Sequence, residues 1–338
     1  MGITIHDIAR EAGVSVRTVS RALNRSGYVA KATRAKIEAV MNRRDFYPSR
    51  IARNLRTGQS QEVCVICGSA TNELVAEEIG AFERRLRECG YWISVLRTDG
   101  RDSILDDIAA ELRARKPAAL ATVYGRNLKD FCKHFDVGNV AVPHVTIDLR
   151  DLASSYDGVV IDRTSGIYDA VRYLYNKGHR RVAYLGLPAD PSRVLGYRRG
   201  IREFGLKEQF LPFEDAPVVE PGVPADRFTS GRKAAAGFLA AKPRPTAVQA
   251  YSDEVALGFI AGLHPHGIRI PGDLDLIGFD NRQVAAWCTP ALTTVAQPAR
   301  AIGEAAAQLL TERLENKDTS KKPRRITVKT KLVIRDSA

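Results

Sequence analysis

From residue 63 onward, short apolar runs alternate with amphipathic segments of helical length. A first series of runs, which we expect to form buried parallel strands, comprises residues 63–67, 93–96, 118–123 and 145–148. A second series comprises residues 159–161, 181–185, 216–219, 247–249 and 274–277. This alternation predicts an α/β fold of doubly wound parallel sheets. Two series predict two Rossmann-like lobes with a cleft between them.

The first 24 residues show a different pattern, in which two short helical segments flank a turn at residues 13–15. This spacing is typical of a helix-turn-helix, and Thr4 is placed to cap its first helix. One face of the second helix, which we expect to pack, carries Val19, Ala22 and Leu23. The opposite face carries Val16, Arg17, Ser20, Arg21 and Asn24. This second face can therefore enter a DNA major groove.

Positive charge is concentrated in the same region. Of the net charge of +12, residues 1–60 contribute +8, from 12 Lys and Arg against 4 Asp and Glu. This asymmetry indicates a polyanionic partner, although a solvated basic surface would carry the same charge. Residues 33–42 predict a third helix, so that residues 1–47 form an all-α headpiece. Residues 48–56 predict a helix too short to be stable alone, so residues 48–60 are expected to be a hinge helix and linker.

Other functional classes find little support. No secretion signal opens the chain and no run of 18 apolar residues occurs, so a cytoplasmic protein without a membrane partner is expected. Cys64 and Cys67 form a CxxC inside an apolar run, which favours two buried strand thiols over a metal or redox site. No nucleophile elbow, metal-ligand cluster or phosphate-binding glycine loop is found, so we expect no enzymatic activity and no cofactor. A small-molecule binding protein of the periplasmic type, without gene regulation, is the alternative reading.

A set of ordered motifs then carries a family resemblance. These motifs are TIHDIAREAGVSVRTVSRALN, YVAKATRAKIEAV, YPSRIARNLRTGQS, VVIDRTSG, YLYNKGHRRVAYLG, IPGDLDLIGFDN and PALTTVAQP. Together they resemble the LacI/GalR family of bacterial repressors over nearly the whole chain. Where family members usually carry Leu-Gly after the third helix, this chain has Arg44-Asp45. Asp tolerates a left-handed helix end less well than Gly, so we expect a less stable headpiece.

The resemblance also implies how the chain is divided. In the related periplasmic sugar-binding architecture the chain crosses back between lobes, which returns residues 292–314 to the first lobe and leaves one final strand at residues 326–334. Residues 61–338 should then form an effector-binding and dimerisation domain. The first lobe should comprise about residues 61–157 plus 288–318, and the second about 158–287 plus 322–338. Some members carry a C-terminal heptad helix that makes tetramers, and none follows Ser337, so a homodimer is expected.

The resemblance implies specific contacts with double-stranded operator DNA. The expected base contacts are Val16, Arg17 and Arg21, because arginine on a groove-facing helix can donate two hydrogen bonds to guanine. The expected phosphate contacts are Thr4, Ser15, Thr18, Ser20, Asn24, Tyr28 and Thr33. Any single Ser or Thr in this set could instead be a helix cap. Leu55 is expected to intercalate in the minor groove beside Arg56, although an apolar residue there could also be a core residue.

The cleft is the expected effector site, because open α/β lobes bind ligands at the carboxyl ends of their strands. Asp148 and Asp280 close predicted strands, and Asp253 follows another. The resemblance implies that Asp148, Arg193 and Asp280 bind a small polar ligand and that Phe228 stacks on its ring. Taken singly, each carboxylate is also typical of a cap or turn.

Departures from the family pattern bear on the effector. Leu149 stands where the purine-responsive type has a stacking Trp, and Ser252 replaces the usual Asn. The loop after the first strand, SATNELVAEE, also lacks the Asn-Pro-Phe run common in sugar-responsive members. Effector identity therefore stays open, with a sugar or sugar derivative favoured. The sequence leaves open which effector binds, whether it induces or corepresses, and which operator is read.

Overall fold

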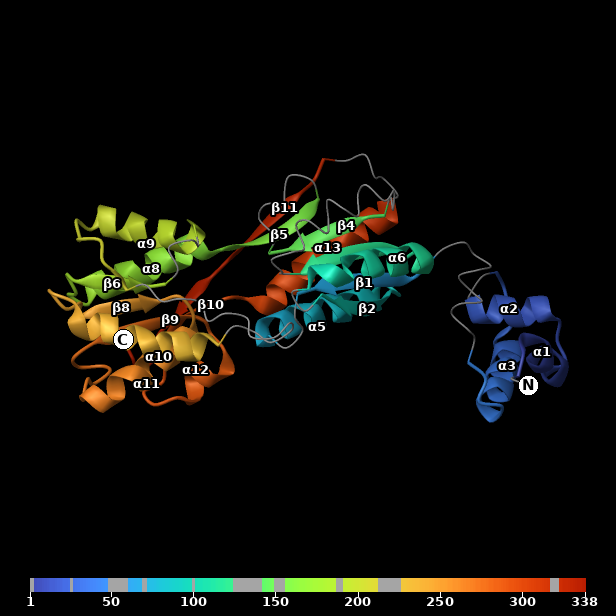
Figure 1. Ribbon diagram of the computed structural model, residues 1–338. Coiled ribbons are helices and arrows are strands. Elements are labelled where there is room, and N and C mark those ends of the chain that lie inside the picture. The colour runs from blue at the N-terminus through green and yellow to red at the C-terminus, as the bar shows by residue number, and fades with distance from the viewer. Residues whose placement is uncertain are drawn as a thin grey trace. The chain divides into compact units, whose positions relative to one another are not determined.

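The computed structural model describes residues 3–24, 27–47, 60–68, 72–98, 101–123, 142–148, 156–186, 191–211, 226–316 and 322–338. The chain forms two compact units, Met1–Gln61 and Glu62–Ala338 (Figure 1). The predicted strand at residues 216–219 lies outside the described residues, as do the predicted hinge residues 48–59.

The first unit contains three helices, α1 (Ile5–Ala12), α2 (Val16–Asn24) and α3 (Lys31–Arg43). Thr4 caps α1 through a reciprocal capping box with Asp7. Gly13 ends α1 in the left-handed conformation, with φ 65°, which turns the chain sharply into α2. A shared core buries Ile8, Ala9, Ala12, Val19, Ala22, Ile37 and Val40. The predicted helix-turn-helix with a third supporting helix is therefore present.

The end of α3 is closed by aspartate where glycine is usual. Asp45 has a φ of 50°, the Phe46 N–H donates to the Met41 carbonyl at 2.9 Å, and the Asp45 N–H donates to the Asn42 carbonyl at 3.3 Å. These two bonds form a Schellman motif, in which Phe46 and Met41 both pack against the core. The left-handed terminus expected at this position is thus adopted by Asp45.

The second unit begins with a six-stranded parallel sheet of order β11-β5-β4-β3-β1-β2. Its strands are β1 (Glu62–Cys67), β2 (Trp92–Arg97), β3 (Ala119–Val123), β4 (His144–Ile147), β5 (Asp157–Asp162) and β11 (Arg325–Lys329). Its helices are α5 (Glu73–Glu88), α6 (Leu105–Arg115) and α13 (Ala299–Asn316), with a 3₁₀ turn at Asp102–Ile104.

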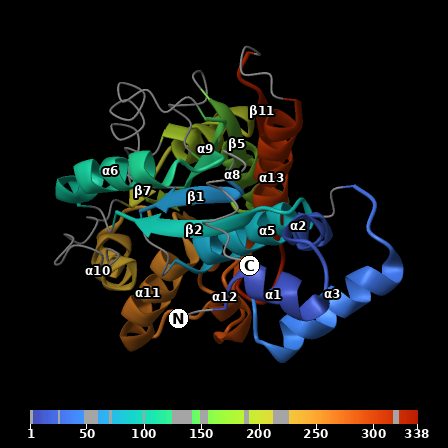
Figure 2. The same cartoon turned by 90° about the vertical axis from the view of Figure 1, so that its right-hand side faces the viewer.

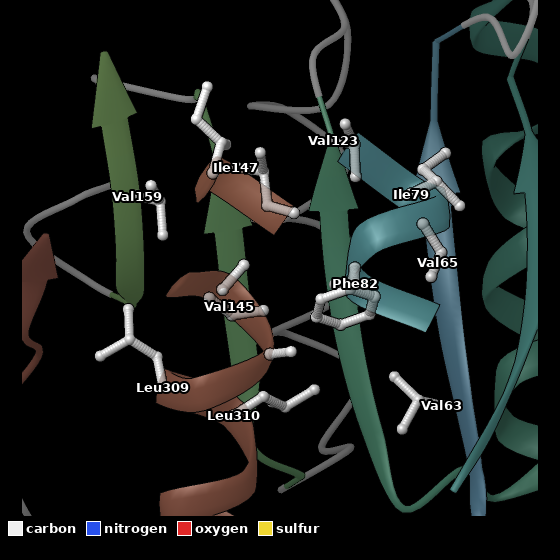
Figure 3. Packing of buried hydrophobic residues seen from close by; sticks show 14 of the residues in the cluster. Val63, Val65, Ile79, Phe82, Val123, Val145, Ile147, Val159, Leu309 and Leu310 are labelled. Atoms are coloured by element: carbon white, nitrogen blue, oxygen red, sulfur yellow. The ribbon is translucent and has the colours of Figure 1, made fainter. Parts of the chain in front are cut away.

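Alternate residues of β1 pack on opposite faces of this sheet. Val63 and Val65 contact a cluster that includes Phe82 of α5 and Leu310 of α13, as Figure 3 shows. Cys64 and Ile66, the alternate residues of β1, belong to a separate cluster with α6. Helices therefore cover both faces, with α5 and α6 on opposite sides of β1 and β2 (Figure 2).

A second six-stranded sheet has the order β12-β10-β9-β8-β6-β7, in which only β12 is antiparallel. Its strands are β6 (Val182–Leu185), β7 (Phe210–Leu211), β8 (Ala247–Ala250), β9 (Asp275–Asp280), β10 (Thr293–Ala296) and β12 (Lys331–Val333). Its helices are α8 (Arg163–Asn176), α9 (Pro191–Glu203), α10 (Arg227–Ala240), α11 (Asp253–Leu263) and α12 (Gln283–Trp287), with a 3₁₀ turn at His264–His266. The pair α8 and α9 packs on one face, and α10 and α11 pack on the other.

Three strand assignments from the sequence are wrong. The strand β5, expected in the second lobe, pairs with β4 and β11 of the first sheet. The residues of β10, which were expected in the first lobe and not identified as a strand, pair with β9 and β12 of the second sheet. The single strand expected at residues 326–334 is two strands, divided at Thr330, that join different sheets. A buried strand has the same apolar pattern in either sheet, so periodicity cannot say which sheet it joins.

Cys64 and Cys67 lie in β1, and both side chains are fully buried. Burial raises the pKa of the Cys64 thiol to about 11, the opposite of a reactive thiolate. Over the described ranges, no group of three or more His, Cys, Asp or Glu side chains is placed to hold a metal ion. In the same residues, no helix has both the length and the apolar character needed to cross a membrane.

Candidate DNA-binding and effector-binding sites

The helix α2 presents an exposed basic face away from the headpiece core. Val19 is fully buried, whereas Arg17 and Arg21, four residues apart, are both exposed on the helix surface. Val16, at the start of the helix, is half-buried. Two guanidinium groups on one exposed helix face are suited to donating paired hydrogen bonds to guanine.

The residues expected to contact phosphates fall into two groups. Thr4 and Ser15 are helix caps, because the Asp7 N–H donates to Thr4 Oγ1 and the Thr18 N–H donates to Ser15 Oγ at 3.1 Å. The hydroxyls of Ser15 and Thr18 are also 2.9 Å apart. The others are Ser20 and Asn24 in α2, Tyr28 in the following loop, where it is 90% exposed, and Thr33 in α3. Leu55 and Arg56 lie outside the described residues.

Arginines that the sequence reasoning passed over hold the three helices of the headpiece together. Arg34 Nη1 of α3 donates to the Ala22 carbonyl of α2 at 3.0 Å. Arg44 Nε donates to Glu11 Oε2 of α1 at 2.6 Å, and Arg43 pairs with the same carboxylate. The Arg34 bond ties α2 to α3, and the Glu11 pairs tie α1 to the end of α3, so the basic face of α2 is presented by a supported element.

In the second unit, the expected effector residue Asp148 closes β4 with a φ of 59°. Arg163, the first residue of α8, donates from Nη1 to Asp148 Oδ1 at 2.6 Å and from Nη2 to Oδ2. Both side chains are at least nine-tenths buried. This bidentate pair joins a strand of the first sheet to a helix of the second lobe.

Asp280 closes β9 with a φ of 116° and lies beside Arg193. Arg193 Nη2 is 3.9 Å from Asp280 Oδ1, and its guanidinium carbon is 4.4 Å from the ring centre of Tyr251 and 4.5 Å from that of Phe279. Gln297 donates to Asp280 and accepts from Arg163 Nη2 at 3.2 Å. Burial raises the pKa of Asp280, and the charge of Arg193 opposes that shift.

Asp253, in contrast, is held by the protein. Its side chain is fully buried, and its two carboxylate oxygens accept from the Arg282 N–H at 2.8 Å and from the Thr294 hydroxyl. Burial, followed by the charge of Asp280, raises its pKa to about 8. Phe228 lies in the first turn of α10 and is 40% exposed. The structure thus brings Asp148, Arg193 and Asp280 together at the junction between the two lobes, whereas the carboxylate of Asp253 is occupied by hydrogen bonds from the protein itself.

Three residues of this junction were missed by the sequence reasoning. Arg163 and Gln297 each follow a strand in motifs already noted, so their positions at strand ends were the available signal. Glu78 of α5 gave no such signal, because it neighbours the apolar position Ile79 within a helix rich in glutamate. We call Glu78, Asp148, Arg163, Arg193, Asp280 and Gln297 the interlobe cluster.

Comparison with known proteins finds family models that match parts of both units. A family model described as "Bacterial regulatory proteins, lacI family" matches residues 4–49, and one described as "Periplasmic binding protein-like domain" matches residues 171–338. The HTH-type transcriptional repressor PurR of Vibrio atlanticus is 31% identical over 329 residues, which are 94% of each chain. Catabolite control protein A of Priestia megaterium is 31% identical over 324 residues, again 94% of each.

Solved structures extend the likeness of fold to the whole chain. The lac repressor dimer bound to operator and the anti-inducer ONPF superposes with a TM-score of 0.82 at 22% identity, covering 100% of this chain and 99% of that one. A LacI family transcriptional regulator from Enterococcus faecalis with bound ribose gives a TM-score of 0.68 at 24% identity, covering 82% and 98%.

Proposed function

Because the chain belongs to the LacI family of bacterial regulatory proteins, we propose that it represses transcription as a homodimer bound to a palindromic operator. It is a DNA-binding transcriptional regulator whose second unit is a ligand-binding domain of the periplasmic-binding type. One helix-turn-helix reads a half-site, and two-fold symmetry supplies the other half. The alternative, a binding protein without gene regulation, is not favoured by relatives that are transcriptional regulators.

The observation that carries the proposal is the exposed basic face of α2 on a capped, cross-braced headpiece. Val16, Arg17 and Arg21 read base edges from this face. Phosphate contacts from the surrounding short polar side chains set the register. In this proposal residues 48–56 become helical on the operator, and Leu55 and Arg56 enter its minor groove.

The effector proposed for the second unit is a sugar or sugar derivative bound at the interlobe cluster. The buried pair of Arg193 and Asp280 offers both donors and acceptors to ligand hydroxyls, and Phe228 offers an exposed ring for stacking. A relative's structure contains ribose, and another is described as a regulator in complex with cellobiose. The regulator acts in the cytoplasm, where operator DNA is found, without catalysis or a cofactor.

The test is selection of bound duplexes from a random pool, followed by fluorescence anisotropy on the selected site. We expect a sequence with dyad symmetry and an affinity that falls steeply with salt, because phosphate binding releases counterions. A selected sequence without dyad symmetry, or an affinity insensitive to salt, would contradict the proposal. Addition of sugars should then change the operator affinity of the wild type but not that of Arg193→Ala, which retains its operator binding without ligand.

A further inference from the structure

Glu78 is a buried carboxylate for which the described residues provide no hydrogen bond or ion pair. Its exposed fraction is 5%, although it lies on α5, where other glutamates are paired. Glu83 pairs with Arg87, and Glu88 pairs with Arg85. Burial of an unpaired carboxylate is costly, so a side chain in this state calls for a functional explanation.

The charges around Glu78 come from both lobes. Asp148 and Asp280 raise the pKa of Glu78, as does the neighbouring Glu77, and Arg163 lowers it. Burial is the largest cause, and together these effects bring the pKa to about 8, so Glu78 is mainly protonated at neutral pH. The helix α13, which packs against α5, carries Arg300 and Glu304, but these two exposed side chains pair with each other.

The cationic groups of the interlobe cluster are already committed to other acids. Both Nη atoms of Arg163 bind Asp148, and Arg193 faces Asp280. The interlobe cluster therefore holds three carboxyl groups against two guanidinium groups. Because Glu78 is mainly protonated without ligand, two carboxylates then balance the two guanidinium groups. A ligand with a positive charge would offset the extra negative charge that appears when Glu78 ionises, whereas a sugar phosphate would add anionic charge beside three acids.

We propose that the effector is a polyhydroxylated molecule with a protonated amino group, as in an amino sugar, and that Glu78 binds this group. The inference rests on the proposed effector site and narrows the chemical class that it takes. Hydroxyls of the ligand bind Arg193 and Asp280, and its ammonium pairs with Glu78. Glu78 then gives up its proton to the solvent, so binding exchanges one proton for one ammonium ion.

Matched probes that differ only in the amino group test this directly. The pairs are D-glucosamine with D-glucose, D-galactosamine with D-galactose, and D-mannosamine with D-mannose, each titrated calorimetrically at about pH 6.5. We expect at least one amine to bind at least about 10-fold more tightly than its hydroxyl twin, the size of one charge-assisted hydrogen bond. Repeating the titration in buffers of different ionisation enthalpy should show release of a proton.

Variants on the same helix assign the effect to Glu78. Glu78→Gln should remove the preference for the amine, and Glu78→Met, which keeps the volume without a polar group, should do the same. Glu83→Gln is the matched control, because it makes the same substitution on α5 at a side chain paired within the helix. A cooperative thermal unfolding transition and operator binding like that of the wild type show that each variant is folded.

Two results would overturn the inference. One is binding of a neutral sugar with an affinity that Glu78→Gln leaves unchanged, and the other is failure of every amine to bind the wild type at about 10 mM. Either result leaves the proposed repressor function standing as long as the wild type binds its operator. Loss of specific operator binding would instead contradict the proposed function itself.

Discussion

At the scale of single residues, Arg17 and Arg21 share one exposed face of α2. We propose that each arginine contacts a different base pair. We predict that Arg21→Ala loses about 1–3 kcal/mol of discrimination at one base pair in each half-site, because a paired hydrogen bond to guanine is removed. Anisotropy with single-substitution operator variants measures this loss.

The control for Arg21 is Arg10→Ala, which removes the same charge from an exposed residue of α1 that pairs with Asp7. This variant should weaken all duplexes by a similar, small factor. If Arg21→Ala behaves in the same way, its guanidinium contacts phosphate, and the assignment to bases is wrong.

Glu78 gives a second residue-scale prediction, on stability against pH. Its folded pKa of about 8 lies above the ordinary value of 4.5, so between these values the folded protein keeps a proton that the unfolded chain has lost. The free energy of unfolding therefore falls as pH rises, with a slope of up to about 1.4 kcal/mol per pH unit from this group. Glu78→Gln removes that slope.

Denaturant unfolding at several pH values between about 5 and 8 measures the difference between wild type and Glu78→Gln. The variant should gain stability relative to the wild type toward the alkaline end. Asp253, whose pKa is also raised to about 8, contributes a slope of the same sign to both proteins and cancels in the comparison. A constant difference across the range would mean that Glu78 is ionised in the folded state.

At the scale of elements, the two left-handed helix ends of the headpiece differ in residue type. Gly13 has a φ of 65° and Asp45 a φ of 50°, and glycine adopts this region at the lowest cost. We predict that Asp45→Gly stabilises the headpiece by about 0.5–1 kcal/mol and that Gly13→Ala destabilises it by about 1–2 kcal/mol. Thermal unfolding followed by circular dichroism measures both.

The space around Gly13 makes this a test of backbone conformation alone. A Cβ there would meet only Lys36 Nζ, at 3.6 Å, which is ordinary contact with a flexible side chain. A neutral Gly13→Ala would therefore show that the turn relaxes out of the left-handed region. A destabilising Asp45→Gly would show that the aspartate side chain contributes more than its backbone strain costs.

The helices and strands differ in how well the sequence predicts them. The helix-turn-helix was predictable because its signals are local: a cap at Thr4, a turn at Gly13 and an apolar face around Val19. Most strands of both sheets were found by their apolar runs. The strands β7 and β10 were not identified, and the residues of β5, β10 and β11 were assigned to the wrong lobe. Strand pairing depends on contacts far apart in sequence, which a periodic pattern does not contain.

The interlobe cluster was predictable only in part, for the same reason. Asp148 and Asp280 stand at strand ends, where topology alone places ligand-binding groups. Glu78 has the sequence environment of a solvated helix residue, and its burial depends on elements far away in the sequence, such as α13, which packs against α5.

At the scale of the whole second unit, the chain passes between the two sheets at three places in the described residues, and each passage carries a polar contact. Arg163 follows β5, Gln297 follows β10, and Thr330 separates β11 from β12. Thr330 Oγ1 donates to the Asp162 carbonyl at 3.1 Å, beside the bonds of Arg163 and Gln297 already described. Two of the three passages therefore belong to the interlobe cluster, so a ligand bound at the proposed site would act on the connections between the lobes.

A further contact joins the lobes away from these passages. Glu73, at the start of α5, is 3.5 Å from Arg282 Nε of the second lobe, and it accepts from the Gln283 N–H at 3.3 Å. Arg282 also pairs with Glu254 at 3.3 Å. These side chains are about one-third exposed, so the contact is weak enough to open and close as the lobes move.

We predict that Glu73→Ala accelerates hydrogen exchange at the Gln283 amide by up to about 5-fold, which corresponds to the 0–1 kcal/mol typical of an exposed ion pair. Glu83→Ala is the control, because Glu83 pairs with Arg87 inside α5 and has no partner across the lobes among the described residues. Exchange at Gln283 should be unchanged in the control. Equal protection of Gln283 in both variants would mean that the Glu73 contact does not hold the lobes. If Glu73→Ala also shifts operator affinity while Glu83→Ala does not, the same contact biases the lobe equilibrium to which operator binding is coupled.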